Sequence, residues 1–131
     1  MQPSLFTRII NGEIPAHRIY EDDQVIAFLT INPVCDGHTL VVPKKQVDQI
    51  WDLDEVDYDY LWMITKKIAL HLRTVMSVDR VSVVIKGFEV PHAHIHLIPI
   101  NLNSGINLDP VPPPPVANDK KLAAIAERIR L

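Results

Sequence analysis

Cysteine is almost absent from this sequence of 131 residues, in which Cys35 is the only one. A single cysteine cannot form an internal disulfide, which favours a reducing compartment. The first residues, Met1-Gln2-Pro3-Ser4, lack the charged and then apolar pattern of a signal peptide. No apolar run approaches the length that spans a bilayer. These absences predict a cytoplasmic domain that does not enter a membrane.

Long basic runs are also missing, since no block of lysine and arginine exceeds a pair and the net charge is -3 at pH 7. A protein that binds duplex nucleic acid through many phosphate contacts needs a more basic surface, so we expect no nucleic-acid partner. A small phosphate ester still fits the composition, because backbone N–H groups, helix ends and histidines can bind it.

Several catalytic signatures are absent as well. The sequence has no Cys-x-x-Cys pair, which leaves a tetrahedral structural zinc site with little support. It has no Gly-x-Gly-x-x-Gly and no Gly-Lys-Ser/Thr loop, which disfavours dinucleotide oxidoreductases and P-loop kinases. It also lacks the Gly-x-Ser-x-Gly turn of the α/β-hydrolases.

Hydrophobic residues make up 47% of the chain and charged residues 22%, a balance typical of one globular domain with a single core. The clearest element is a long central helix over residues 54–75, with apolar side chains at helical spacing and acidic residues at its start. Ser4 and Asp119 mark the starts of a short N-terminal helix and a C-terminal helix. The remaining patterns predict strands at residues 18–21, 25–29, 39–42, 81–85 and 92–98. This order predicts an α+β fold in which a largely antiparallel sheet of about five strands packs on the central helix.

Proline is concentrated near the C-terminus, at Pro110 and in the run Pro112-Pro113-Pro114-Pro115. We expect an extended polyproline II segment that acts as a stiff spacer over the fold, with docking on a proline-recognition domain as the alternative. Residues 1–109 are then expected to form the main domain. Residues 110–131 would add the spacer and a helix that packs on the same domain.

His92, His94 and His96 occupy alternate positions of the last expected strand. Side chains alternate faces along a strand, so the three imidazoles are expected on one face, with the intervening apolar residues on the other face beneath the central helix. Packing alone is a poor explanation for three imidazoles in this pattern. The strand is therefore the candidate functional site.

The histidines fit two chemistries. In one, the imidazoles bind a metal ion, because His-x-His on a strand is a zinc-ligand arrangement that His38, Cys35 or a carboxylate would complete. In the other, one neutral imidazole attacks a phosphorus atom while its neighbours donate to phosphate oxygens or protonate a leaving group. The spacing of the histidines does not decide between them.

The histidine segment resembles the signature of the histidine triad (HIT) superfamily, His-φ-His-φ-His-φ-φ with φ apolar. It stands here as His92-Ala93-His94-Ile95-His96-Leu97-Ile98. The likeness extends beyond this motif, because residues 6–16, 20–33 and 37–44 are similar, in order, to the segments that precede it in the family. The blocks together are most similar to the Hint-like branch of small homodimeric nucleotide hydrolases.

This resemblance implies a HIT-like α+β fold, a homodimer, a purine nucleotide-type substrate, and neither a cofactor nor a metal. It implies that His94 attacks the α-phosphorus of a nucleoside phosphoramidate or a related derivative and forms a covalent nucleotidyl-histidine, which water then hydrolyses. His92, His96 and His38 would surround the phosphate. An ordinary core role is the alternative for the apolar members of the nucleotide-binding set, which by position in the family pattern comprises Phe6, Ile9, Ile14, Phe28, Leu29, Thr30, Ile31 and Glu89.

Departures from the family pattern include two places that are expected to contact the nucleotide. Thr30 replaces an acidic residue that contacts the ribose hydroxyls, and it lacks the acceptor strength of a carboxylate. The family's Gly-Gln-Ser/Thr-Val reads Gly87-Phe88-Glu89-Val90 here. This removes a polar pair that touches the phosphate, and Glu89 would repel an anion if it pointed inward. Two alternatives therefore stay open: a non-catalytic nucleotide-binding dimer, and a metal-dependent hydrolase that uses the same histidines.

Overall fold

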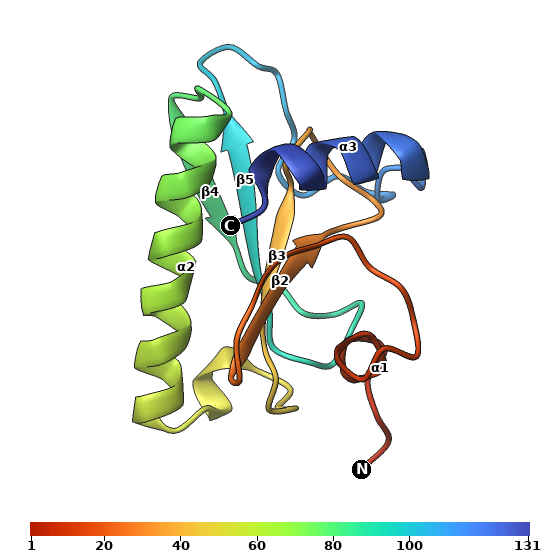
Figure 1. Cartoon of the computed structure of the whole chain (residues 1–131), viewed down its shortest axis with the longest axis vertical. Helices are drawn as coiled ribbons and strands as arrows, with labels where there is room; N and C mark the ends of the chain where they lie inside the picture. The colour runs from red at the N-terminus through yellow and green to blue at the C-terminus, as the bar shows by residue number, and fades with distance from the viewer.

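The computed structural model describes the whole chain, residues 1–131, as one five-stranded sheet with helices around it (Figure 1). The sheet is antiparallel throughout, in the order β1-β2-β3-β5-β4. Its strands are β1 (Arg18–Glu21), β2 (Val25–Leu29), β3 (Thr39–Pro43), β4 (Arg80–Val84) and β5 (Ile95–Ile100). The helices are α1 (Leu5–Ile10), the 3-10 turn η1 (Ile50–Asp52), α2 (Glu55–Val75) and α3 (Asp119–Ile129). The predicted α+β fold is confirmed.

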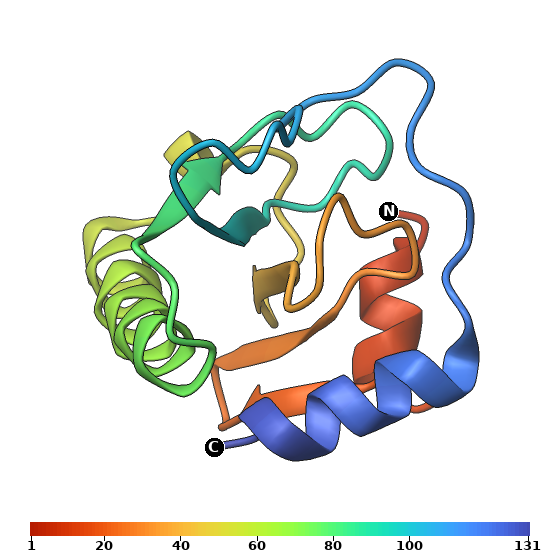
Figure 2. The ribbon, with the colours of Figure 1, turned by 90° about the horizontal axis from the view of Figure 1, so that it is seen from above.

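The sheet separates α2 from α1, which lie on its opposite sides (Figure 2). Alternation along β2 explains the division, because successive side chains point to opposite faces. Val25, Ala27 and Leu29 belong to the large core beneath α2 and α3, whereas Ile26 and Phe28 pack on the α1 side. Every residue of β2 is buried, so this strand is covered on both faces.

The central helix α2 carries the apolar stripe that its sequence predicts. It begins one residue after the predicted start because Asp54 is its N-cap, whose side chain accepts a hydrogen bond from the N–H of Asp57. The buried stripe packs into the large core and includes Leu61, Ile64, Ile68 and Leu72. No helix in the structure combines the length and the apolar composition that crossing a membrane requires.

The strand β5 begins later than predicted, at Ile95 rather than at His92. Pro91 has no N–H to give to a strand ladder. The N–H of His92 donates to the carbonyl of Val90 at 2.8 Å within a turn, and the N–H of Ala93 donates to Val47, which lies outside the sheet. His92 and His94 therefore lie in the connection before β5, and only His96 lies on the strand.

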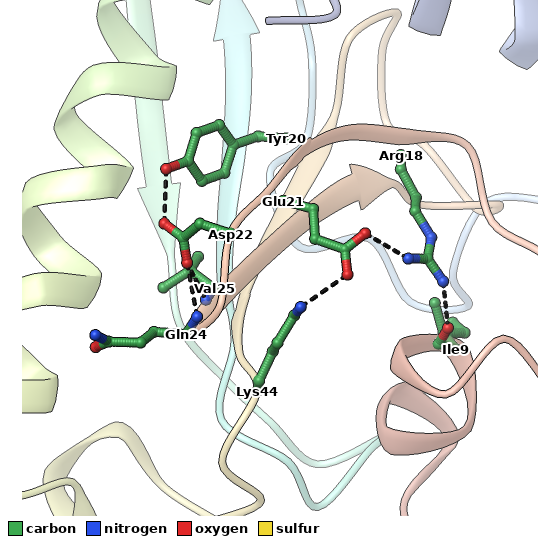
Figure 3. A network of polar contacts seen from close by, with 8 residues as sticks. All are labelled: Ile9, Arg18, Tyr20, Glu21, Asp22, Gln24, Val25 and Lys44. Carbon is green, nitrogen blue, oxygen red and sulfur yellow. Dashed lines mark hydrogen bonds and ion pairs between the residues drawn. The ribbon is translucent and has the colours of Figure 1, made fainter.

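A polar network attaches α1 to the hairpin of β1 and β2 (Figure 3). Arg18 donates from Nη2 to the carbonyl of Ile9 at 2.7 Å and also pairs with Glu21. Glu21 pairs in turn with Nζ of Lys44, at 2.8 Å, just beyond the end of β3. These contacts join α1 to two strands, so they hold Phe6 and the rest of the helix over the sheet.

Candidate functional site

A cavity of about 290 Å³ opens on the α1 side of the sheet. His38, His94 and His96 line it, together with residues of α1, β2, β3 and β4. Its far wall comes from the proline segment, here defined as residues 108–114. Every member of the nucleotide-binding set taken from the family pattern lines this cavity, namely Phe6, Ile9, Ile14, Phe28, Leu29, Thr30, Ile31 and Glu89.

The register of the sheet aims His96 into the cavity. His96 lies opposite Leu40 of β3 and Val84 of β4, and both of these side chains line the cavity. Its neighbours along β5, Ile95 and Leu97, face the large core instead. The alternation that the sequence predicted for this strand thus holds from Ile95 onward.

His38 and His96 share a hydrogen bond in which Nε2 of His38 lies 2.9 Å from Nδ1 of His96. The N–H of Val34 donates to Nδ1 of His38 at 3.1 Å, so this nitrogen is an acceptor. A neutral His38 must then carry its proton on Nε2 and donate it to His96. Since Nδ1 of His96 accepts, a neutral His96 carries its proton on Nε2.

His94 is oriented by the backbone of the same segment. Its Nδ1 lies 2.7 Å from the carbonyl oxygen of His92, which can only accept, so Nδ1 carries the proton of the neutral ring. The edge contact with Phe6, at 4.8 Å between ring centroids and an interplanar angle of 88°, holds the ring from the other side. The structure leaves Nε2 of His94 without a hydrogen-bond partner in the protein.

His92 lies behind the cavity rather than in its lining. The side chain is completely buried. Nε2 donates to the carbonyl of Pro43 at 2.7 Å, and Nδ1 accepts from the hydroxyl of Ser4 at 2.6 Å. Both ring nitrogens are thus engaged within the protein. This differs from the expectation that His92 shares one face with His94 and His96, and the reason is the turn before β5.

Burial keeps the imidazoles of the site neutral. It lowers the pKa of His38 to about 3, with a smaller effect from the neighbouring His96. It lowers the pKa of His96 to about 4, again with burial as the main cause. Burial also lowers the pKa values of His92 and His94. Near neutral pH these imidazoles are therefore neutral, and the proton positions derived above from their hydrogen bonds apply.

The sequence did not point to several residues of the cavity. Lys86 is the only lysine or arginine in its lining, and it lies two residues beyond the end of β4. Asp109 also lines the cavity, as do Pro110, Pro113 and Pro114, which were expected to belong to a spacer. The amide of Asn32 fastens the segment by donating to the carbonyl of Pro114 at 3.0 Å. No local pattern marks these residues, because long-range contacts bring them to the site.

The arrangement of donors also bears on metal binding. No group of three or more histidine, cysteine, aspartate or glutamate side chains is placed to hold a metal ion together. Cys35, considered above as a ligand, donates from Sγ to the carbonyl of Pro99 at 3.2 Å, and burial raises its pKa to about 11.

Comparison with known proteins gives a consistent result for this fold and site. A family model described as the HIT domain matches residues 11–101. A HIT-like protein of Borreliella burgdorferi is 38% identical over 112 residues, which cover 80% of this chain and 81% of the relative. A HIT-like protein of Methanocaldococcus jannaschii is 43% identical over 102 residues, which cover 72% of this chain and 77% of the relative.

Solved structures similar to this chain also belong to HIT proteins. A Hit-like protein from Bartonella henselae superposes with a TM-score of 0.84 at 33% identity, covering 97% of this chain and 94% of that one. A hypothetical histidine triad nucleotide-binding protein from Sulfolobus tokodaii gives 0.83 at 26% identity, with 95% and 88% covered. A HIT family hydrolase from Clostridium thermocellum gives 0.68 at 25% identity, with 83% and 99% covered. This chain belongs to the histidine triad (HIT) family.

Proposed function

We propose that this chain is a nucleotide hydrolase or transferase that cleaves nucleoside phosphoramidates or related nucleoside phosphate derivatives at the α-phosphorus, with His94 as the nucleophile. The observation that carries the proposal is the 2.7 Å hydrogen bond from Nδ1 of His94 to the carbonyl of His92. It leaves the lone pair of Nε2 free to attack in a cavity that His94 lines. The nucleotide-binding protein and the hydrolase among the similar structures support the same class of activity.

The first step forms a bond from Nε2 of His94 to phosphorus as the bond from phosphorus to the leaving group breaks. An amine leaving group departs with the electron pair and takes a proton from solvent. The imidazole becomes positively charged, and its Nδ1–H then makes a stronger hydrogen bond to the carbonyl of His92. This carbonyl acts like a fixed dipole that stabilises the covalent state.

The second step is hydrolysis. Water attacks the phosphorus, the bond to Nε2 of His94 breaks, and a nucleoside monophosphate leaves while the proton of the water passes to solvent. His96 contributes a hydrogen bond from Nε2–H to the phosphoryl oxygens or the leaving atom in both steps, because His38 holds it in that tautomer. His92 acts by holding the turn that positions His94, since neither of its ring nitrogens is free.

The walls of the cavity suit a purine nucleoside. Ile9, Ile14 and Ile31 offer apolar contacts to a flat base, beside the edge-on pair of Phe6 and Phe28 with centroids 5.5 Å apart. Thr30 accepts from the N–H of Asn32 at 3.2 Å, so its own O–H is free to donate to a ribose hydroxyl. A hydroxyl donor thus stands where relatives have a carboxylate acceptor.

The test is release of adenosine monophosphate from adenosine 5′-phosphoramidate by the purified chain and by His94→Ala, with His17→Ala as the matched control outside the cavity. We expect turnover by the wild type and by the control, and none by His94→Ala. Unchanged turnover by His94→Ala contradicts the proposal. Tight nucleotide binding without turnover of several leaving groups would favour a binding protein. Loss of activity on exhaustive chelation would favour a metal enzyme.

We also propose a homodimer. β4 is an edge strand of the sheet, so its outer backbone groups have no neighbour strand. Val83 of β4 and Ile85 beyond it are exposed, as are Met63 and Leu70 of the adjacent α2. A second copy of this surface would cover these side chains and pair the edge. Sedimentation should give twice the monomer mass, and a monomer at micromolar concentration would contradict this assembly.

A further inference from the structure

Lys86 stands at the junction of two cavities. The first is the histidine-lined cavity described above, and the second, of about 330 Å³, lies between the residues around η1 and those that follow β4. Trp51 and Phe88 are among the walls of the second cavity. His94 and Lys86 are the only residues that line both. A substrate that placed its nucleoside in the first cavity and its leaving group in the second would therefore have its phosphorus beside these two side chains.

The charges around Lys86 are unusual for an anion site. Nζ of Lys86 lies 2.9 Å from Oδ1 of Asp109 and 3.4 Å from Oε1 of Glu89. Hydrogen bonding to these carboxylates raises the pKa of Lys86, so the ammonium group keeps its charge. The sequence left open whether Glu89 repels a phosphate. The structure shows that Glu89 is paired with a cation at the edge of the site.

Resting on the proposed function, we propose that Lys86 binds the phosphoryl group of the substrate and replaces the polar pair that is missing from this chain. An ammonium group has three N–H donors, of which one is donated to Asp109 at 2.9 Å and a second points to the ion-paired Glu89 at 3.4 Å. The third is available to a non-bridging phosphoryl oxygen, where it neutralises charge next to His94. The carboxylates of Asp109 and Glu89 orient Lys86, but together they leave the group with one net negative charge.

This arrangement predicts opposite effects on nucleotide binding when the charge of Lys86 or that of Glu89 is removed. Removing the charge of Lys86 must weaken binding of a nucleotide without affecting binding of the nucleoside, which has no phosphate. Removing the charge of Glu89 must strengthen nucleotide binding, because the net charge of the group rises from negative to neutral. A lysine that served only to hold the loop after β4 would show neither pattern.

The experiment is calorimetric titration of adenosine monophosphate and adenosine into the wild type, Lys86→Met, Lys86→Arg and Glu89→Gln. Lys120→Met is the control, because Lys120 is exposed and lines neither cavity. We expect Lys86→Met to bind adenosine monophosphate about tenfold more weakly, with partial recovery in Lys86→Arg and unchanged adenosine binding. Glu89→Gln should bind adenosine monophosphate more tightly than the wild type does, and Lys120→Met should bind both ligands normally.

Equal nucleotide affinity in the wild type and Lys86→Met overturns the inference about Lys86. An equal loss of adenosine and adenosine monophosphate binding also overturns it, because it indicates a structural role. These outcomes leave the proposed function standing if the wild type turns over adenosine 5′-phosphoramidate. Failure of the wild type to bind either ligand would overturn both proposals.

Discussion

Nε2 of His38 donates to Nδ1 of His96 across 2.9 Å, and the backbone N–H of Val34 sets the direction of this hydrogen bond by donating to the other nitrogen of His38. A single backbone amide thus determines which nitrogen of His96 carries a proton in the cavity. His94 has the opposite tautomer, because its Nδ1 donates to a carbonyl. The two adjacent rings therefore offer complementary groups, a lone pair from His94 and an N–H from His96.

These tautomers can be observed directly. We predict that long-range ¹H–¹⁵N correlation spectra near pH 7 show protons on Nε2 of His38, His92 and His96 and on Nδ1 of His94. Protonated and unprotonated ring nitrogens have clearly different ¹⁵N chemical shifts. Single histidine substitutions assign each signal to a residue. A proton on Nε2 of His94 would contradict its role as a nucleophile.

The stability of the protein should depend on pH through the buried histidines. Burial lowers the pKa of His38 to about 3 and that of His96 to about 4, whereas an unfolded histidine titrates near about 6.5. Between about pH 6.5 and pH 4 the unfolded chain binds protons that the folded chain does not, so the free energy of unfolding falls as the pH is lowered. Urea unfolding at pH 7, 6, 5 and 4.5 measures this decline. The double variant His38→Gln, His96→Gln should show a shallower decline, and an unchanged slope would contradict the explanation.

Ser4→Ala tests the support behind His92. The Ser4 hydroxyl donates to Nδ1 of the buried His92 and accepts from the N–H of Thr7 as the N-cap of α1. Its removal leaves a buried acceptor without a donor and a helix without its cap, so we expect a loss of about 1–3 kcal/mol in the free energy of unfolding. Ser104→Ala, in an exposed loop, should stay within about 0.5 kcal/mol of the wild type. Equal changes in the free energy of unfolding for the two substitutions would show that the contact with His92 does not stabilise the fold.

Phe6→Leu separates the role of the aromatic ring from that of its volume. The ring meets His94 edge-on at 4.8 Å between centroids, and leucine keeps the apolar contact while losing this geometry. We expect a change of less than about 1.5 kcal/mol in the free energy of unfolding. The value of kcat/KM for adenosine 5′-phosphoramidate should fall by up to about tenfold, the worth of one aromatic pair. Wild-type kinetics in this variant would show that Phe6 does not hold His94 in place.

The elements of the fold were predictable where local patterns decide them. The apolar run of β2 and the helical stripe of α2 depend on neighbouring residues, and the strand and the helix were both predicted from the sequence. The start of β5 was not, because it depends on a contact between Ala93 and the distant Val47 as well as on Pro91. That contact moved His92 away from the face occupied by His96.

The candidate site was predictable to the extent that the family pattern marks it. The pattern identified residues of α1 and β2 that line the cavity, and spacing alone could not have separated them from ordinary core. Lys86 and Asp109 carry no such mark, and they meet only because the chain after β5 returns across the cavity. The prolines from Pro110 onward were expected to be a spacer, because proline composition predicts an extended conformation but not the contacts that the segment makes.

The most direct measurement is a search for the covalent state of His94. The chain is mixed with adenosine 5′-phosphoramidate, quenched within a single turnover in alkaline denaturant, and analysed by intact mass and peptide mapping. We predict one adenylyl group on the imidazole of His94, which disappears as adenosine monophosphate is released and is absent in His94→Ala. Full turnover by the wild type with no adduct on His94 at any time, or turnover that persists in His94→Ala, would contradict nucleophilic attack by this histidine.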